Sequence, residues 1–248
     1  MMWRLIAVSV LACAGLNYSS PAFAQAAAPA PKIWTVAAGA GLALTSGNKD
    51  TSTVNASYDI TYDPQTRNVI KSDGLLIRGK TDNELSADRV GLNARDEYTM
   101  NRRTYVFGQH QYLRDRFKHI DYLIAPTGGV GYRVVETPKT TLGVDGGIGG
   151  VWEKNAGADV TSSGAVTLGQ KLAHTLTATT SLTQSFSGLW KTGDFKDSLH
   201  VLSLGVAAAM STRTQLKVEL LDTYQNKPPL VTIQKNDVAI LVAVVYKM

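Results

Sequence analysis

The stretch TVNASYDITY at residues 53–62 alternates strictly between two kinds of side chain. Its even positions carry Val, Ala, Tyr, Ile and Tyr, and its odd positions carry Thr, Asn, Ser, Asp and Thr. A repeat of two residues places the apolar side chains on one face of an extended strand and the polar ones on the other. The stretch therefore predicts a β-strand with one apolar and one polar face.

The same period recurs along most of the chain, for example at 34–44, 142–152, 216–224 and 238–248. Helical spacing fits none of these windows. The segments predict about twelve strands, and the pattern is compatible with 10–14. The segment at 67–79 is the least regular, because apolar residues occupy both of its faces. The predicted strands lie at 33–45, 52–62, 67–79, 86–99, 103–115, 119–134, 139–152, 159–170, 174–187, 198–210, 213–224 and 236–247.

The predicted strands are longer than those of ordinary globular domains. They have about 11–14 residues, whereas a typical strand has about 5–6 and a tilted strand that crosses a bilayer needs about 9–11. Their second face carries mostly Gly, Ala, Ser and Thr, whereas a soluble β-sandwich or lipocalin-like barrel would carry more charged residues there. The pattern therefore favours an all-β, antiparallel transmembrane β-barrel, with a soluble β-protein as the alternative.

Aromatic residues gather near the predicted strand ends, as the interfacial girdles of membrane barrels require. They are Trp34, Tyr62, Tyr98, Tyr105, Tyr132, Trp152 and Tyr246. Tight links are predicted at 63–66, 100–102, 136–139, 171–173 and 211–212, and the links between them at 46–51, 80–85, 116–118, 153–158, 188–197 and 226–235. The second set is longer and more polar, except that the link at 116–118 is short. Short turns on one rim and longer loops on the other are typical of outer-membrane barrels, and both termini then lie on the short-turn, periplasmic side.

The first 24 residues are predicted to be a cleaved signal peptide. Arg4 supplies a positive start, residues 5–16 are apolar, and 22–24 read Ala-Phe-Ala. About twelve apolar residues are fewer than the ~20 of a spanning helix, which disfavours the alternative of an N-terminal anchor. Lipidation at Cys13 is a further, weaker alternative. The predicted organisation is a signal peptide at 1–24, a flexible leader at 25–32 and an outer-membrane barrel at 33–248.

Composition and motifs exclude several classes of function. The net charge of +5 is spread along the chain without a Lys/Arg block, so no nucleic-acid partner is predicted. Zinc, redox, phosphate-loop and dinucleotide motifs are missing from the sequence, so no catalytic, cofactor-binding or metal residues are assigned. His119 and His174 are expected in solvated links. His110 and His200 are expected on strands, with side chains that reach the lumen or a rim rather than act as bases. The chain is therefore predicted to be non-enzymatic, with a membrane-embedded enzyme that modifies lipid or lipopolysaccharide as the alternative.

Charged residues inside the predicted strands form the candidate site. A charge that faces lipid at the midplane costs about 2–4 kcal/mol, so these residues are expected to face the lumen. The predicted lumen charges are Arg89, Arg95, Glu97, Arg114, Asp121, Arg133, Asp145, Lys217 and Glu219. Two interpretations stay open: a structural network that fills and rigidifies the lumen, or a mildly cationic constriction that favours anions.

Several motifs together resemble one family. They are GLALTSGN at 41–48, YVFG at 105–108, YLRDRF at 112–117 with Ile120-Asp121, GVGYR at 129–133, KND at 235–237 and VVYK at 244–247. In this order they are similar to the DUF481 family, whose members are often labelled salt-induced outer membrane proteins. One departure is that the chain ends in Met248, whereas outer-membrane barrels usually end on an aromatic residue, and Tyr246 is the nearest one on that face.

The resemblance implies an outer-membrane β-barrel of the Gram-negative envelope. The expected functions are a narrow channel for small hydrophilic or anionic solutes, or a structural or stress-related envelope protein. The expected partners are outer-membrane lipid, lipopolysaccharide and, through the C-terminal strand, the barrel assembly machinery. The barrel is expected to be a monomer without cofactors.

Overall fold

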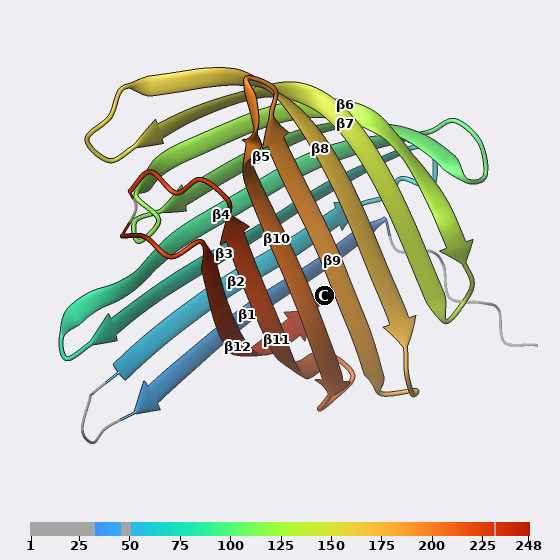
Figure 1. Ribbon diagram of the computed structural model, residues 1–248. Helices are drawn as coiled ribbons and strands as arrows, with labels where there is room; N and C mark the ends of the chain where they lie inside the picture. The colour runs from blue at the N-terminus through green and yellow to red at the C-terminus, as the bar shows by residue number, and fades with distance from the viewer. Residues whose placement is uncertain (1–32, 46–50, 231) are drawn as a thin grey trace, which may run out of the picture. The chain divides into compact units, whose positions relative to one another are not determined.

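The computed structural model describes residues 33–45, 51–230 and 232–248. They form one closed, antiparallel barrel in which each strand pairs with its neighbours in sequence and β1 pairs with β12 (Figure 1). The strands are β1 (Trp34–Thr45), β2 (Thr51–Tyr62), β3 (Asn68–Thr81), β4 (Glu84–Thr99), β5 (Thr104–Asp115), β6 (Ile120–Glu136), β7 (Thr140–Asn155), β8 (Val160–Thr175), β9 (Thr180–Lys191), β10 (Asp194–Ala209), β11 (Thr214–Gln225) and β12 (Asn236–Lys247). The prediction of a barrel with about twelve strands is confirmed.

The predicted signal peptide and leader lie outside the described residues, as does most of the first predicted long link. Within the described part of the chain, no helix is long and apolar enough to cross a membrane.

The strand β8 and the strand β9 differ from the prediction. β8 continues to Thr175, so 171–173 is strand and the turn lies at 176–179. The turn forms there because the Thr177 hydroxyl accepts a hydrogen bond from the Thr179 backbone N–H, and Thr177 and Thr180 exchange backbone hydrogen bonds. Because Leu172 and His174 continue the alternation of β8, nothing in the sequence pattern ends the strand earlier.

The predicted difference in link length between the two rims is wrong. Residues 188–197 are mostly strand and leave a link of only 192–193, and the links 82–83, 116–119 and 156–159 are no longer than most links of the other rim. Among the described links, only 226–235 is long. We therefore name the rims by the chain ends: β1 begins and β12 ends at the terminal rim, where Met248 N–H donates to the Val36 carbonyl, and the other is the distal rim.

Parity decides which face each side chain occupies. Even positions lie outside, where large apolar side chains such as Val54, Leu92, Ile148 and Val242 are exposed. Odd positions face the lumen. An exposed apolar band on a closed barrel is the surface that lipid covers, because all backbone hydrogen bonds are made within the barrel.

Two aromatic girdles flank the apolar band. The terminal rim carries Trp34, Tyr62, Tyr98, Tyr132 and Tyr246 on the outer face. The distal rim carries Tyr112, Trp152, Trp190 and Tyr224. Tyr105 does not belong to either girdle, because its odd position turns it into the lumen, where its side chain is buried. Girdles at both rims are typical of outer-membrane barrels.

Candidate functional site

The lumen is divided into two regions of different composition. In its distal half the inward side chains form two closely packed apolar clusters, with paired charged groups between them. We call this half the distal plug, whose buried apolar residues are Ile77, Leu113, Ile120, Leu123, Ala125, Val151, Ala165, Leu189, Leu221 and Leu241. The terminal half carries mainly Ser, Thr, Gly and charged residues, with a few buried side chains such as Tyr105, Phe107 and Val245, and we call it the terminal vestibule.

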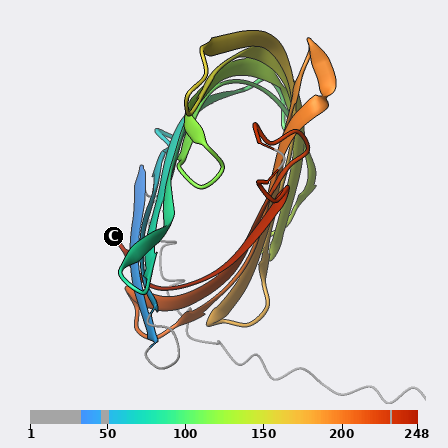
Figure 2. The same ribbon diagram turned by 60° about the vertical axis from the view of Figure 1, so that its left-hand side comes forward.

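Two distal links bend into the barrel and complete the plug. Figure 2 shows the green link between β5 and β6 and the dark red link between β11 and β12 turning toward the interior. Asp115 holds the first link, because its Oδ1 accepts hydrogen bonds from the backbone N–H groups of Phe117 and Lys118, each at 3.2 Å. His119 completes this turn with a φ of 55°.

Lys118 joins the two links. Its side chain is 0% exposed, and its ammonium lies 3.1 Å from the carboxylate of Asp237. The same ammonium donates to the Lys235 carbonyl at 3.2 Å and to the Gln234 carbonyl at 3.5 Å. A buried ammonium needs such partners, because removing it from water is costly. The Lys118 contacts therefore hold the distal links together across the lumen.

Charged groups inside the plug are all paired. Arg89 donates to the Thr223 hydroxyl at 2.6 Å, which connects β4 to β11, and its guanidinium lies 3.7 Å from Asp115. On another part of the wall, Lys191 forms ion pairs with Glu153 and with Asp197. Of these contacts, the bond from Arg89 to Thr223 joins strands that are far apart in the barrel order, whereas the others join adjacent strands or strands separated by one.

Arg95 is the centre of a network in the terminal vestibule. Its guanidinium donates to Glu97 and to Asp145, both at 2.9 Å, and to the Gln109 amide oxygen at 2.7 Å. Lys71 donates to the other oxygen of Glu97 at 2.7 Å. The Arg95 guanidinium also lies over the ring of Phe107, 3.7 Å from its centroid. The network follows the wall from β3 to β7.

The remaining predicted lumen charges occupy two other parts of the vestibule. Lys217 donates to Glu219 at 2.6 Å, and the Ser203 hydroxyl donates to the other oxygen of this carboxylate. Arg133 lies over the Tyr105 ring at 5.3 Å from its centroid and donates to the Thr99 hydroxyl at 3.3 Å. The structure thus brings the predicted lumen charges into separate groups rather than one ring.

Two predicted site residues do not face the lumen. Arg114 has an even position, so its side chain lies outside near the distal rim, where it pairs with Asp88 at 3.4 Å and is 44% exposed. Asp121 is exposed as well, because the pairing of β6 shifts register between Ile120 and Tyr122 and changes the alternation there. The expectation that strand charges all point inward fails at the rim, where the outer face is no longer in hydrocarbon.

The histidines form no catalytic arrangement among the described residues. His110 lies on the outer face of β5, and His174 lies on β8, not in a turn, bonded to the Thr140 hydroxyl at 2.7 Å. His200 Nε2 lies 3.0 Å from the Ser198 hydroxyl, but within the described chain no carboxylate bonds its ring, and Ser198 is buried. The searched residues also hold no group of three metal-ligating side chains.

The sequence interpretation missed several residues that matter in the lumen. Lys118 and Lys191 fall in segments predicted as loops, where local pattern gives no sign of burial. Lys71 and Glu153 lie on or beside predicted strands, and their inward parity could have identified them. The irregular third segment was itself a signal, because its Leu75 and Ile77 are apolar residues at inward positions.

The comparison with protein families decides what this barrel is related to. The family model described as "Protein of unknown function, DUF481" matches residues 38–248. The chain belongs to the DUF481 family. The match covers nearly the whole described barrel, and the resemblance predicted from the sequence motifs is confirmed. No curated protein matches the chain.

Several solved structures are similar to this DUF481 barrel. The superposition with the NanC porin covers 86% of this chain and 96% of the porin chain, with 8% identity and a TM-score of 0.46. The translocator domain of the autotransporter NalP from Neisseria meningitidis covers 87% and 88%, with 14% identity and a TM-score of 0.49. An outer membrane channel from Pseudomonas putida F1 covers 87% and 94%, with 12% identity and a TM-score of 0.48.

Proposed function

We propose that this barrel is a narrow, gated channel for small hydrophilic solutes in the outer membrane of a Gram-negative cell. Solutes enter the terminal vestibule, and the distal plug closes the path to the other side. The observation that carries this proposal is the division of one lumen into a half rich in polar and charged side chains and a half with two buried apolar clusters, where two inward links are joined to each other. The terminal rim then faces the periplasm, as in other barrels of this type.

The construction of the plug supports a gate rather than a permanent wall. Each link is bonded to the barrel wall beside it, but the described contacts that join the two links across the lumen are those of a single ammonium, that of Lys118, with Asp237 and two backbone carbonyls. Asp237 is half-exposed, so water can replace the ammonium on its carboxylate when the links separate. A change in these few contacts would therefore separate the two links from each other, while each stays bonded to its own side of the wall.

The vestibule gives no strong preference for one sign of charge. Its inward cations are Lys71, Arg95, Arg133, Lys171, Lys217 and, at the rim, Lys247, and its inward carboxylates are Asp59, Asp73, Glu97, Asp145 and Glu219. The two sets are nearly equal in number, so the proposed solutes are small and hydrophilic rather than specifically anionic.

Single-channel recording in planar bilayers tests the gate. Wild-type barrel should conduct rarely and in small steps. Lys118→Met keeps the side-chain length but removes the ammonium, so it should open more often and in larger steps. Lys217→Met, which removes a vestibule ammonium outside the plug, is the matched control and should gate like wild type. If neither wild type nor Lys118→Met conducts, the barrel is not a channel and a structural envelope role takes its place.

A further inference from the structure

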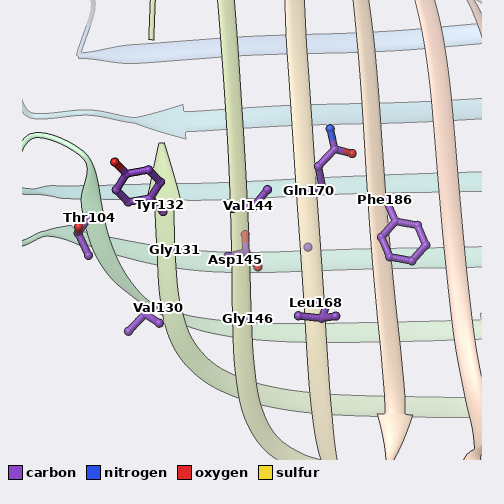
Figure 3. Close-up of a pocket in the computed structure, with 11 residues that line it drawn as sticks. Thr104, Val130, Gly131, Tyr132, Val144, Asp145, Gly146, Leu168, Gln170 and Phe186 are labelled. Carbon is purple, nitrogen blue, oxygen red and sulfur yellow. The ribbon is translucent and has the colours of Figure 1, made fainter. Parts of the chain in front are cut away.

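A groove of about 530 Å³ is hollowed into the outer face of the barrel, on the surface that faces lipid (Figure 3). Its volume lies within the ~300–1,000 Å³ of small-molecule pockets. Its outward side chains come from five neighbouring strands, β5 to β9, and are Thr104, Val130, Tyr132, Val144, Leu168, Gln170 and Phe186. The groove is therefore separate from the lumen described above.

A missing side chain creates the groove. Val130, Gly146 and Leu168 are cross-strand neighbours in one row, so Gly146 leaves a gap between two larger apolar side chains. Figure 3 shows Val130 and Leu168 on either side of Gly146. A methyl group at Gly146 would meet Leu168 and a backbone oxygen only at ordinary contact distances of 3.5 and 3.8 Å. The gap is thus open space and not a strained turn.

The amide of Gln170 interrupts the lining away from the rim, where Thr104 and Tyr132 carry hydroxyl groups. Tyr132, Val144, Gln170 and Phe186 form the next row toward the terminal rim. Gln170 makes no hydrogen bond or ion pair with the described residues, yet its amide lies on the outer, lipid-facing side. A polar group in that position is costly unless it finds a partner, because hydrocarbon offers none. An ester carbonyl of a lipid would be such a partner.

A cation marks the rim end of the groove. Arg103, in the link between β4 and β5, donates to the Tyr132 hydroxyl at 3.4 Å and is exposed. Arg102 precedes Arg103 in the link, and the carboxylate of Glu136 interacts electrostatically with the Arg103 guanidinium. Arginine and a tyrosine hydroxyl at the membrane interface are suited to a phosphate group, which accepts several hydrogen bonds. From the terminal rim toward the middle of the barrel, the groove therefore presents the Arg103 cation, then the Gln170 amide and then the apolar gap at Gly146.

We propose that this groove binds one anionic glycerophospholipid, with its phosphate at Arg103 and Tyr132, an ester carbonyl at Gln170 and an acyl chain over Gly146. The proposal rests on the proposed membrane location of the barrel and is independent of its conductance. The occupant is a phospholipid and not lipopolysaccharide, because the cationic end lies at the terminal rim, which we assign to the phospholipid leaflet.

The opposite side of the barrel offers a control inside the same chain. Arg213 donates to the Tyr246 hydroxyl at 3.3 Å, which repeats the bond between Arg103 and Tyr132. In the row below Tyr246, however, Val244 has Ala40 rather than glycine as its neighbour. This second pair therefore has the rim chemistry without the gap of the groove.

Native mass spectrometry of the purified barrel with phosphatidylglycerol tests the site. Wild type should retain one lipid. Gly146→Leu fills the gap and Arg103→Gln removes the cation, and each should weaken retention about tenfold. Gln170→Leu, which suits the lipid face and should fold normally, should weaken it by a similar factor. Arg213→Gln is the matched control and should retain the lipid like wild type.

Three outcomes would overturn the proposal. Equal losses in Arg103→Gln and Arg213→Gln, with none in Gly146→Leu, would show only general attraction to a basic rim. Unchanged retention in Gln170→Leu and Gly146→Leu would show that the groove is not used. Stronger retention of lipid A than of phosphatidylglycerol would show that the groove faces the lipopolysaccharide leaflet and not the phospholipid leaflet. Failure of the channel would be seen separately, in the conductance of the wild type and of Lys118→Met.

Discussion

The distal plug and the terminal vestibule are built on the same twelve strands, yet one is closed and the other accessible. In the plug, inward positions carry residues such as Leu123 and Val151, and the charged groups all have partners. In the vestibule, Lys171 and Asp59 face the lumen without a hydrogen bond or ion pair to the described residues. The difference teaches that barrel closure sets the walls, while the inward side chains decide whether the lumen is filled.

Removing the cation from a buried pair should have the largest effect. In Lys191→Met, the Glu153 carboxylate, which is 2% exposed, loses its partner inside the plug. Breaking such a pair costs about 3–5 kcal/mol in the free energy of unfolding. Urea unfolding of the barrel in lipid vesicles, followed by tryptophan fluorescence, measures the loss.

The matched control for this prediction lies in the vestibule. Lys217→Met removes an ammonium that is one-third exposed, so the loss should stay at about 1 kcal/mol or less. Equal losses in the two variants would contradict the distinction between a dry plug and an accessible vestibule.

Truncation of the plug core should also have a large effect. Leu123→Ala removes a buried side chain from the apolar cluster and should lower the free energy of unfolding by about 2–3 kcal/mol. The same urea titration measures it. A loss below about 0.5 kcal/mol, the range of ordinary surface substitutions, would show that the distal half is loosely packed.

Reversal of the Arg95 charge should affect both stability and ion preference. Arg95→Glu places a carboxylate beside Glu97 and Asp145 and removes the charged hydrogen bonds to both, which should cost about 3 kcal/mol in the free energy of unfolding. In the Lys118→Met background, the reversal potential in a KCl gradient should move toward cation preference. An unchanged reversal potential would show that Arg95 lies off the conduction path and serves only as a structural cross-link.

The smallest effect on stability is expected at Lys171. Its ammonium has no hydrogen bond or ion pair to the described residues, so Lys171→Glu should change the free energy of unfolding by no more than about 0.5 kcal/mol. The reversal potential should still move toward cations, with Lys171→Gln giving a smaller change in the same direction. A large loss in the free energy of unfolding of Lys171→Gln would show that the vestibule around Lys171 is tightly packed, as the plug is, and would contradict the difference between the two regions.

Period two in the sequence was sufficient to predict the barrel, its approximate strand number and most of the girdle. The alternating residues 53–62 lie in β2, as predicted. Successive side chains of a strand point to opposite faces, and the outward face meets lipid, so each residue type depends only on its own position in the strand. Inward parity likewise predicted Arg95, Glu97 and Asp145 as lumen residues, but not that their side chains meet. The prediction that Arg114 faces the lumen is wrong, although its even position at the end of β5 already indicates the outer face.

Only the tertiary structure decided that the lumen is divided. Leu75, Leu123 and Leu221 are far apart in the sequence, and they form packed clusters only because barrel closure brings their strands around one axis. The burial of Lys118 also depends on a link more than a hundred residues away. Local alternation determines which face a side chain occupies, whereas contacts across the lumen follow from closure, which no short window of sequence contains.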